Sequence, residues 1–255
     1  NNTAIKGILR ASRHAGRHII TTPLEHASVS GCLTAMQEQG AQIDVVSIDR
    51  QGRVDLEELA ELMRKDTVLV TVSAVDSELG VVQPVKEIAR LLEGYPHCRL
   101  HVDATQAVGK MPISFDGADT MSLAAHKFYG LNGVGLLLRR EEVGMEPLIH
   151  GGVSVSLYRS GTPPVGLAAA TETALEMALK EQPARYERVK ALNERLRAAL
   201  AGYPKVAINS PEHASPHILN LSVEGVRGAA MAAALDARGV CVSVKSACSV
   251  EGTPS

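Results

Sequence analysis

The chain has 255 residues, of which 45% are hydrophobic and 21% charged, and its net charge is −2 at pH 7. This composition is typical of a globular protein. The near-neutral charge and the 3% aromatic content provide no electrostatic or stacking basis for binding nucleic acid, and no apolar run is long enough to span a membrane. We therefore expect neither nucleic acid nor a membrane as a partner. The four cysteines form no C-x-x-C pair, which favours the reducing cytoplasm as the location.

Short β-branched runs alternate with amphipathic segments along the first part of the chain. Helices are expected at residues 27–39, 56–65 and 85–92, and strands at residues 19–22, 43–48, 68–73, 98–102, 120–123 and 133–138. Strands that alternate with helices in this way indicate βαβ units. The fold class predicted is therefore α/β, with a mostly parallel central sheet flanked by helices.

A Gly-Thr-Pro-Pro segment at 161–164 ends this alternation. The remainder predicts a long helix at 167–202 that kinks at Pro183, then strands at 206–209, 217–223 and 240–244 and a helix at 229–238. We place a domain boundary near Gln182, which gives a large domain (1–182) that includes the start of the connecting helix, and a small C-terminal α/β domain (183–255). Both ends resemble cuts through a longer protein, so we expect the large domain to lack its N-terminal part and the small domain to be truncated.

A carboxylate and a lysine follow two of the expected strands. Asp103 ends the apolar run at 98–102, and Lys127 comes 24 residues later, just after the next run. Because side chains at the carboxyl ends of neighbouring parallel strands meet in one crevice, we expect these two groups to share a site. Such a pair suits pyridoxal 5′-phosphate (PLP): the lysine holds the aldehyde as a Schiff base, and the carboxylate keeps the pyridine nitrogen protonated.

Several short motifs extend this interpretation. His-Val-Asp-Ala-Thr-Gln (101–106), His-Lys-Phe-Tyr-Gly (126–130), Arg-Ser-Gly-Thr (159–162) and Ser-Ala-Cys-Ser (246–249) occur in that order, with further matches at 25–26 and 78–83. In this order and over essentially the whole chain, the sequence resembles the NifS/IscS-like cysteine desulfurases, which are class V, fold-type I PLP enzymes. The resemblance implies conversion of L-cysteine to L-alanine, with the sulfur passed through a protein persulfide to iron–sulfur cluster assembly or thiolation. It also implies a sulfur-acceptor protein, such as an iron–sulfur scaffold, as a partner.

The resemblance assigns the cofactor ring to four residues. Lys127 resembles the Schiff-base lysine, and Asp103 resembles the partner of the pyridine nitrogen. Gln106 resembles the donor to the phenolic oxygen of the ring. His26 resembles the imidazole that stacks on the pyridine face and helps to move protons.

The resemblance also assigns residues to phosphate binding and to sulfur transfer. His126 resembles a phosphate contact, and Thr162 resembles a threonine that reaches the phosphate of the other subunit, which implies a homodimer. Cys248 resembles the loop nucleophile that takes the sulfur, a role that requires a thiolate on a mobile segment. Ser77 stands where these enzymes usually have an asparagine that contacts cofactor and substrate, and Ala124 stands where they have a phosphate-binding serine.

Two other functions remain open at this point. A selenocysteine lyase, or another class V C–S lyase or aminotransferase, shares the lysine, aspartate and histidine. A catalytically degenerate homologue acting as a binding or regulatory protein is favoured by Ser77 and Ala124, whereas retention of the other site residues argues against it. His14 and His18 have i, i+4 spacing, but no third ligand accompanies them, so no metal is expected.

Overall fold

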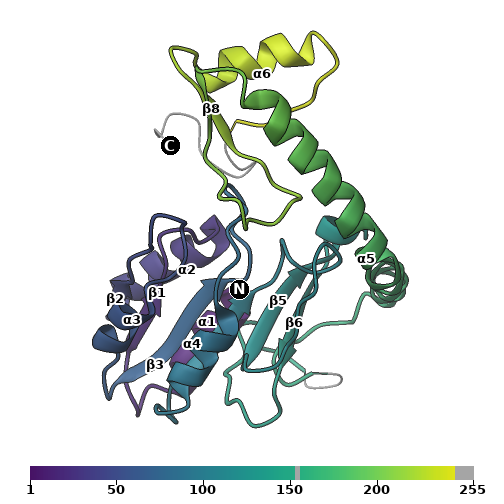
Figure 1. The fold of residues 1–255 in the computed structure, drawn as a ribbon. Coiled ribbons are helices and arrows are strands. Elements are labelled where there is room, and N and C mark those ends of the chain that lie inside the picture. The colour runs from purple at the N-terminus through teal and green to yellow at the C-terminus, as the bar shows by residue number, and fades with distance from the viewer. Residues whose placement is uncertain (153–155, 245–255) are drawn as a thin grey trace.

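The structure, a computed structural model, describes residues 1–152 and 156–244 (Figure 1). Its main feature is a six-stranded sheet with the strand order β2-β1-β3-β4-β5-β6. The strands are β1 (His18–Thr21), β2 (Gln42–Val45), β3 (Thr67–Ser73), β4 (Arg99–Asp103), β5 (Thr120–Ala124) and β6 (Gly135–Arg139). All neighbours pair in parallel except β6, which runs antiparallel to β5. The predicted mostly parallel sheet is confirmed.

Helices cover both faces of this sheet. Because side chains alternate along a strand, Ile19 of β1 packs into a core with α1 (Asn2–Ala11) and α2 (Ala27–Glu38). The next residue, Ile20, points the other way, into a core with α3 (Leu56–Leu62) and α4 (Val85–Leu92). The result is a three-layer α/β arrangement that holds the strand ends in fixed positions.

The strand order reverses beside β1. From β1 the chain first forms β2 on one side and then crosses to form β3 on the other side. The loops that leave the carboxyl ends of β1 and β3 therefore run in opposite directions, and such a switch point is where open α/β sheets leave a ligand crevice. The residues after β1, β3, β4 and β5 are thus the candidates for a site.

Two N-terminal elements differ from the sequence prediction. We did not predict α1, although Ala4, Ile5 and Ile8 form its buried face with the spacing of an amphipathic helix. The second strand ends at Val45 rather than at residue 48. Ile48 instead forms an isolated antiparallel bridge with Val54 outside the sheet, because the chain has already turned toward α3.

The C-terminal part is carried by one long helix. α5 (Val165–Leu200) continues through Pro183, and Figure 1 shows it bending on its way from β5 and β6 to the small C-terminal sheet. That sheet pairs β7 (Val206–Ile208) with β8 (Leu221–Val223) in antiparallel fashion, and α6 (Gly228–Asp236) follows. The domain boundary near Gln182 falls inside α5 and stays a prediction.

Two strand predictions in this part were wrong. The strand expected at 217–223 is formed only from Leu221 onward. Residues 240–244 form no strand, and their three valines are 46–50% exposed. A run of β-branched residues favours an extended chain, but it needs a neighbouring edge to become a strand, and the small sheet as described has only two strands.

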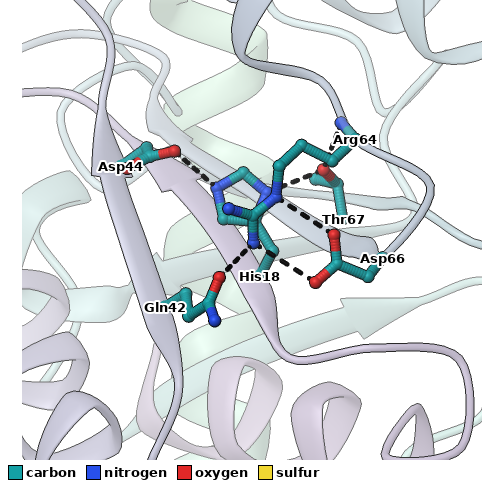
Figure 2. Close-up of polar contacts among 6 residues, drawn as sticks. All are labelled: His18, Gln42, Asp44, Arg64, Asp66 and Thr67. Atoms are coloured by element: carbon teal, nitrogen blue, oxygen red, sulfur yellow. Dashed lines mark hydrogen bonds and ion pairs between the residues drawn. The ribbon is translucent and has the colours of Figure 1, made fainter.

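A polar cluster around a buried histidine links the amino-terminal halves of three strands (Figure 2). His18 at the start of β1 is fully buried. Its Nδ1 lies 2.7 Å from Oγ1 of Thr67 on β3, and its Nε2 lies 2.9 Å from a carboxylate oxygen of Asp44 on β2. Arg64 completes the cluster through Asp66 and Gln42. The cluster lies at the edge opposite to the strand ends discussed above, so we assign it a structural role.

Among the described residues, no helix is both long and apolar enough to cross a membrane.

Candidate active site

Asp103 lies at the centre of the carboxyl edge of the sheet. It ends β4 and pairs in register with Ser73 of β3 on one side and Ser122 of β5 on the other. The residue is only 5% exposed. Its Oδ1 accepts a hydrogen bond from the backbone N–H of Thr105 at 3.0 Å. In the described part of the chain, no lysine, arginine or histidine forms an ion pair with this carboxylate.

Hydrogen bonds connect Asp103 to His26. The amide of Asn1 donates from Nδ2 both to Oδ2 of Asp103 and to Oγ of Ser28, at 2.7 Å each. The Nδ1 atom of His26, which caps the N-terminus of α2, accepts from Ser28 N at 3.1 Å and lies 2.9 Å from Ser28 Oγ. Because Nδ1 is the acceptor, the ring proton is assigned to Nε2. Two predicted site residues from separate strand ends are thus joined.

Lys127 lies in a short turn directly after β5. The turn is a 3₁₀ helix, η1 (Ala125–Phe128), and it ends at Tyr129, whose φ of +69° is left-handed. A bulky residue rarely adopts this conformation outside strained functional turns. Within η1 the Lys127 side chain is half-buried and His126 is exposed.

Gln106 lies beside a second lysine. The Nζ atom of Lys110 donates to Oε1 of Gln106 at 2.5 Å. Burial, together with the positive charge of Lys127, lowers the pKa of Lys110 to about 8. The turn that follows β4 therefore brings Gln106 and Lys110 toward the turn that carries Lys127.

The other predicted residues are less closely connected. Ser77 is half-buried in the turn after β3, and Asp76 shapes this turn by accepting backbone N–H groups of residues 78, 79 and 80. Thr162 is exposed in the segment before α5, apart from the hydrogen-bonded groups above, and its predicted contact with a partner subunit stays a prediction. Cys248 lies outside the described residues.

Glu25 is a site residue that the sequence analysis did not single out. Its carboxylate accepts from Ser73 N, Ser73 Oγ and Thr22 Oγ1, each at 2.9 Å. Burial raises the pKa of this carboxyl to about 7, and the charge of Asp103 acts in the same direction. Glu25 bridges the ends of β1 and β3, where the strand order reverses. The sequence offered only its position next to His26 as a signal.

His101 is buried next to the site, and its burial predicts how the stability of the fold depends on pH. The ring is completely buried, with Nδ1 2.8 Å from Thr120 Oγ1 and Nε2 2.9 Å from Asn1 Oδ1. Burial lowers the pKa of His101 from 6.5 to about 3. The unfolded chain therefore takes up this proton first, so the contribution of His101 to stability is complete above pH 6.5 and is lost as the pH falls toward 3.

We expect the loss to be on the order of a few kcal/mol between pH 7 and pH 4. The raised pKa of Glu25 acts in the opposite direction between pH 4.5 and 7, so the measurement compares variants rather than absolute values. Urea unfolding of His101→Gln at several pH values should show a weaker loss of stability on acidification than the wild type. Equal pH slopes for the two proteins would contradict this assignment.

The donor set at this edge fits a PLP ring. A buried carboxylate, an imidazole, an amide and a lysine all come from the carboxyl ends of β1, β4 and β5. These are the types of group that a protonated pyridine, its phenolic oxygen and its aldehyde require. For the cofactor phosphate the described chain offers fewer hydrogen-bond donors, since Ala124 has no hydroxyl. Among the described residues, no group of three or more His, Cys, Asp or Glu side chains is placed to hold a metal ion.

The fold and these side chains define a PLP-transferase-like protein, and the comparisons agree. The model of the aminotransferase class-V family matches residues 1–254. The chain belongs to this family. It is 38% identical to the "NifS/IcsS protein homolog" of Lactobacillus delbrueckii over 97% of its own length and 66% of the relative. It is 36% identical to "Cysteine desulfurase IscS" of Dictyoglomus turgidum over 98% of its own length and 64% of the relative.

Solved structures give the same result. A "NIFS-LIKE PROTEIN" superposes with a TM-score of 0.91 at 34% identity, covering 95% of this chain and 67% of that one. DndA from Streptomyces lividans superposes with a TM-score of 0.82 at 35% identity, covering 92% and 68%. The resemblance to NifS/IscS-like proteins and the fold prediction are therefore confirmed. The chain spans about two thirds of the length of these relatives and 55% of the human cysteine desulfurase.

Proposed function

We propose that this protein is a PLP-dependent cysteine desulfurase. One observation carries the proposal: Asp103, buried between Ser73 and Ser122, is linked by hydrogen bonds to His26 and lies one strand away from the turn that presents Lys127. Curated relatives that are 36–37% identical to this chain over the aligned residues are named cysteine desulfurases. L-cysteine is the proposed substrate, and L-alanine is the product that remains after sulfur is removed.

The site residues divide the work of binding and proton transfer. PLP, when bound, supplies an electron sink for the substrate carbon. Asp103 holds a proton at the pyridine nitrogen, and Gln106 donates to the phenolic oxygen. Lys127 would anchor the cofactor, and its amine would move the proton of the substrate Cα. His26 would help to move protons through its Nε2.

Sulfur transfer falls to Cys248. Its thiolate attacks the sulfur of the bound cysteine, so that an S–S bond forms and the Cβ–S bond breaks. The electron pair of that bond stays on Cβ, which takes up a proton to give alanine. We further propose that the resulting persulfide passes to a sulfur-acceptor protein, that the enzyme works in the cytoplasm, and that it is a homodimer in which Thr162 serves the partner's site.

The function is tested by following both products. Full-length protein supplied with PLP, L-cysteine and a thiol reductant should release alanine and sulfide in equal amounts. Preferential turnover of L-selenocysteine, with little sulfide from cysteine, would favour the selenocysteine lyase. No turnover of either amino acid by a folded, PLP-loaded protein would favour the degenerate homologue.

Asp103→Asn provides a graded test of the cofactor site. The amide keeps the shape and the hydrogen bond from Thr105 but cannot hold a proton at the pyridine nitrogen as a carboxylate does. A hydrogen bond to a charged group contributes roughly 1.5–3 kcal/mol, so kcat/KM should fall by about 10- to 100-fold. Steady-state kinetics of wild type and variant check this, with unchanged circular dichroism as the control. Activity within two-fold of wild type would remove Asp103 from the cofactor site.

A further inference from the structure

Lys110 is a half-buried cation to which the described part of the chain offers one side-chain hydrogen-bond partner. Its Nζ donates to Oε1 of Gln106 at 2.5 Å. None of the ion pairs among the described residues includes Lys110. Its charge interacts with two basic residues: Lys127 lowers the pKa of Lys110, and Lys110 lowers the pKa of His217. An ammonium in such a place depends strongly on its single acceptor.

Backbone hydrogen bonds hold both Gln106 and Lys110 in place. Asp103 accepts the N–H of Thr105 and so starts the turn that carries Gln106. Lys110 follows one helical turn later, with its own N–H donating to the carbonyl of Ala107. The pair therefore forms within a turn that the cofactor-binding carboxylate itself organises.

A glycine lets this turn approach Lys127 closely. Gly109 has a left-handed φ of +72°, and a Cβ there would lie 2.9 Å from the Cβ of Ala178 on α5 and 3.1 Å from that of Phe128 in η1. Real Cβ atoms essentially never approach another atom within 3.0 Å, so a side chain at residue 109 would push α5 away. The Gln106–Lys110 turn is thus packed directly against the turn that carries Lys127.

The chemistry of the pair determines which way the Gln106 amide faces. A lysine ammonium has three donors and no acceptor, so the amide must turn its oxygen toward Lys110. The NH₂ group then faces away from Lys110, and no hydrogen bond from Nε2 is found within residues 1–152 and 156–244. A reversed amide would set two donors against each other in a half-buried site.

We propose that Lys110 is a positioning residue: by binding Oε1, it holds the Gln106 amide in the one orientation that presents an N–H donor to the phenolic oxygen of the cofactor. This inference rests on the proposed function, since it requires a PLP ring beside Gln106. Lys110 itself does not touch the cofactor. Its effect on the cofactor passes through Gln106.

The test is a double-mutant cycle read on the cofactor rather than on turnover. Full-length apoprotein of the wild type, Lys110→Met, Gln106→Leu and the double variant is titrated with PLP, and the affinity and the visible absorption band are recorded. Each single variant should weaken PLP binding about ten-fold, as expected for one lost hydrogen bond, and both should shift the band in the same direction. The double variant should be no worse than either single variant.

Two further variants separate positioning from general damage. Lys110→Arg keeps a donor-only side chain and should restore the wild-type band, whereas Lys190→Met removes an exposed lysine of α5 and should change nothing. If Lys110→Met does not fold, Lys110→Gln replaces it and should reproduce its band shift, because an amide partner tolerates both orientations of Gln106. A wild type that binds no PLP overturns the proposed function. A wild type that binds PLP, with Lys110 and Gln106 effects that are independent, overturns only the role of Lys110.

Discussion

Lys127→Ala should abolish covalent PLP binding and all turnover of L-cysteine. Lys127 is the lysine at the carboxyl edge of the sheet that follows the strand next to Asp103. Without its amine, neither the covalent anchor nor the base that moves the Cα proton remains, and the loss should exceed 10³-fold because general-base catalysis alone contributes about 10²–10⁴-fold. The measurement is borohydride reduction of the PLP-loaded protein followed by intact mass.

A matched control comes from elsewhere on the chain. Lys190→Ala removes an exposed lysine of α5 and should leave both the reducible adduct and the activity unchanged. A reducible PLP adduct on Lys127→Ala at wild-type yield would show that another lysine anchors the cofactor. Lys110 would then be the first to examine, because it is the neighbour whose pKa is lowered to about 8.

Cys248→Ser should leave PLP bound but abolish sulfide release. The proposed role of this residue is to receive the sulfur, and a hydroxyl cannot form the S–S bond that this role requires. The absorption of the bound cofactor should be unchanged, because the pyridine contacts come from the sheet edge. Sulfide is measured with L-cysteine and a thiol reductant.

The other cysteines provide the controls. Cys32 and Cys98 are buried. Burial raises the pKa of Cys98 to about 12, so this thiol forms almost no thiolate at neutral pH. Cys241 is exposed and is the closest match to a loop thiol. Cys241→Ser should retain sulfide release. Sulfide production by Cys248→Ser at the wild-type rate would point to a lyase that expels sulfur without a protein persulfide.

The sheet was predictable because its signals are local. Each strand from β1 to β6 is a short β-branched or apolar run. The helix α3 also has a clear cap at Asp55, whose side chain accepts from the N–H groups of residues 57 and 58. The helix at residues 2–11 had an equally local signal that we did not use. The strand expected at residues 240–244 failed for a different reason, since strand formation depends on a partner edge that the run itself does not encode.

Site residues could be predicted from the sequence alone only where a residue type suited to the reaction directly follows an expected strand. Asp103 and Lys127 follow directly from that rule, whereas His26, Gln106 and Ser77 came from the resemblance. Glu25 and Lys110 were not singled out because isolated glutamates and lysines are usually solvated. Glu25 matters through its contacts across the fold with Ser73, and Lys110 matters through its hydrogen bond to Gln106 and through the nearby charge of Lys127.

Intact mass spectrometry of the PLP-loaded, full-length protein after brief treatment with L-cysteine tests the central claim most directly. The account predicts a gain of one sulfur atom, mapped to Cys248 and removed by a thiol reductant, and no such gain in Cys248→Ser. A protein that turns over L-cysteine but carries no added sulfur on Cys248 at any time would contradict the account.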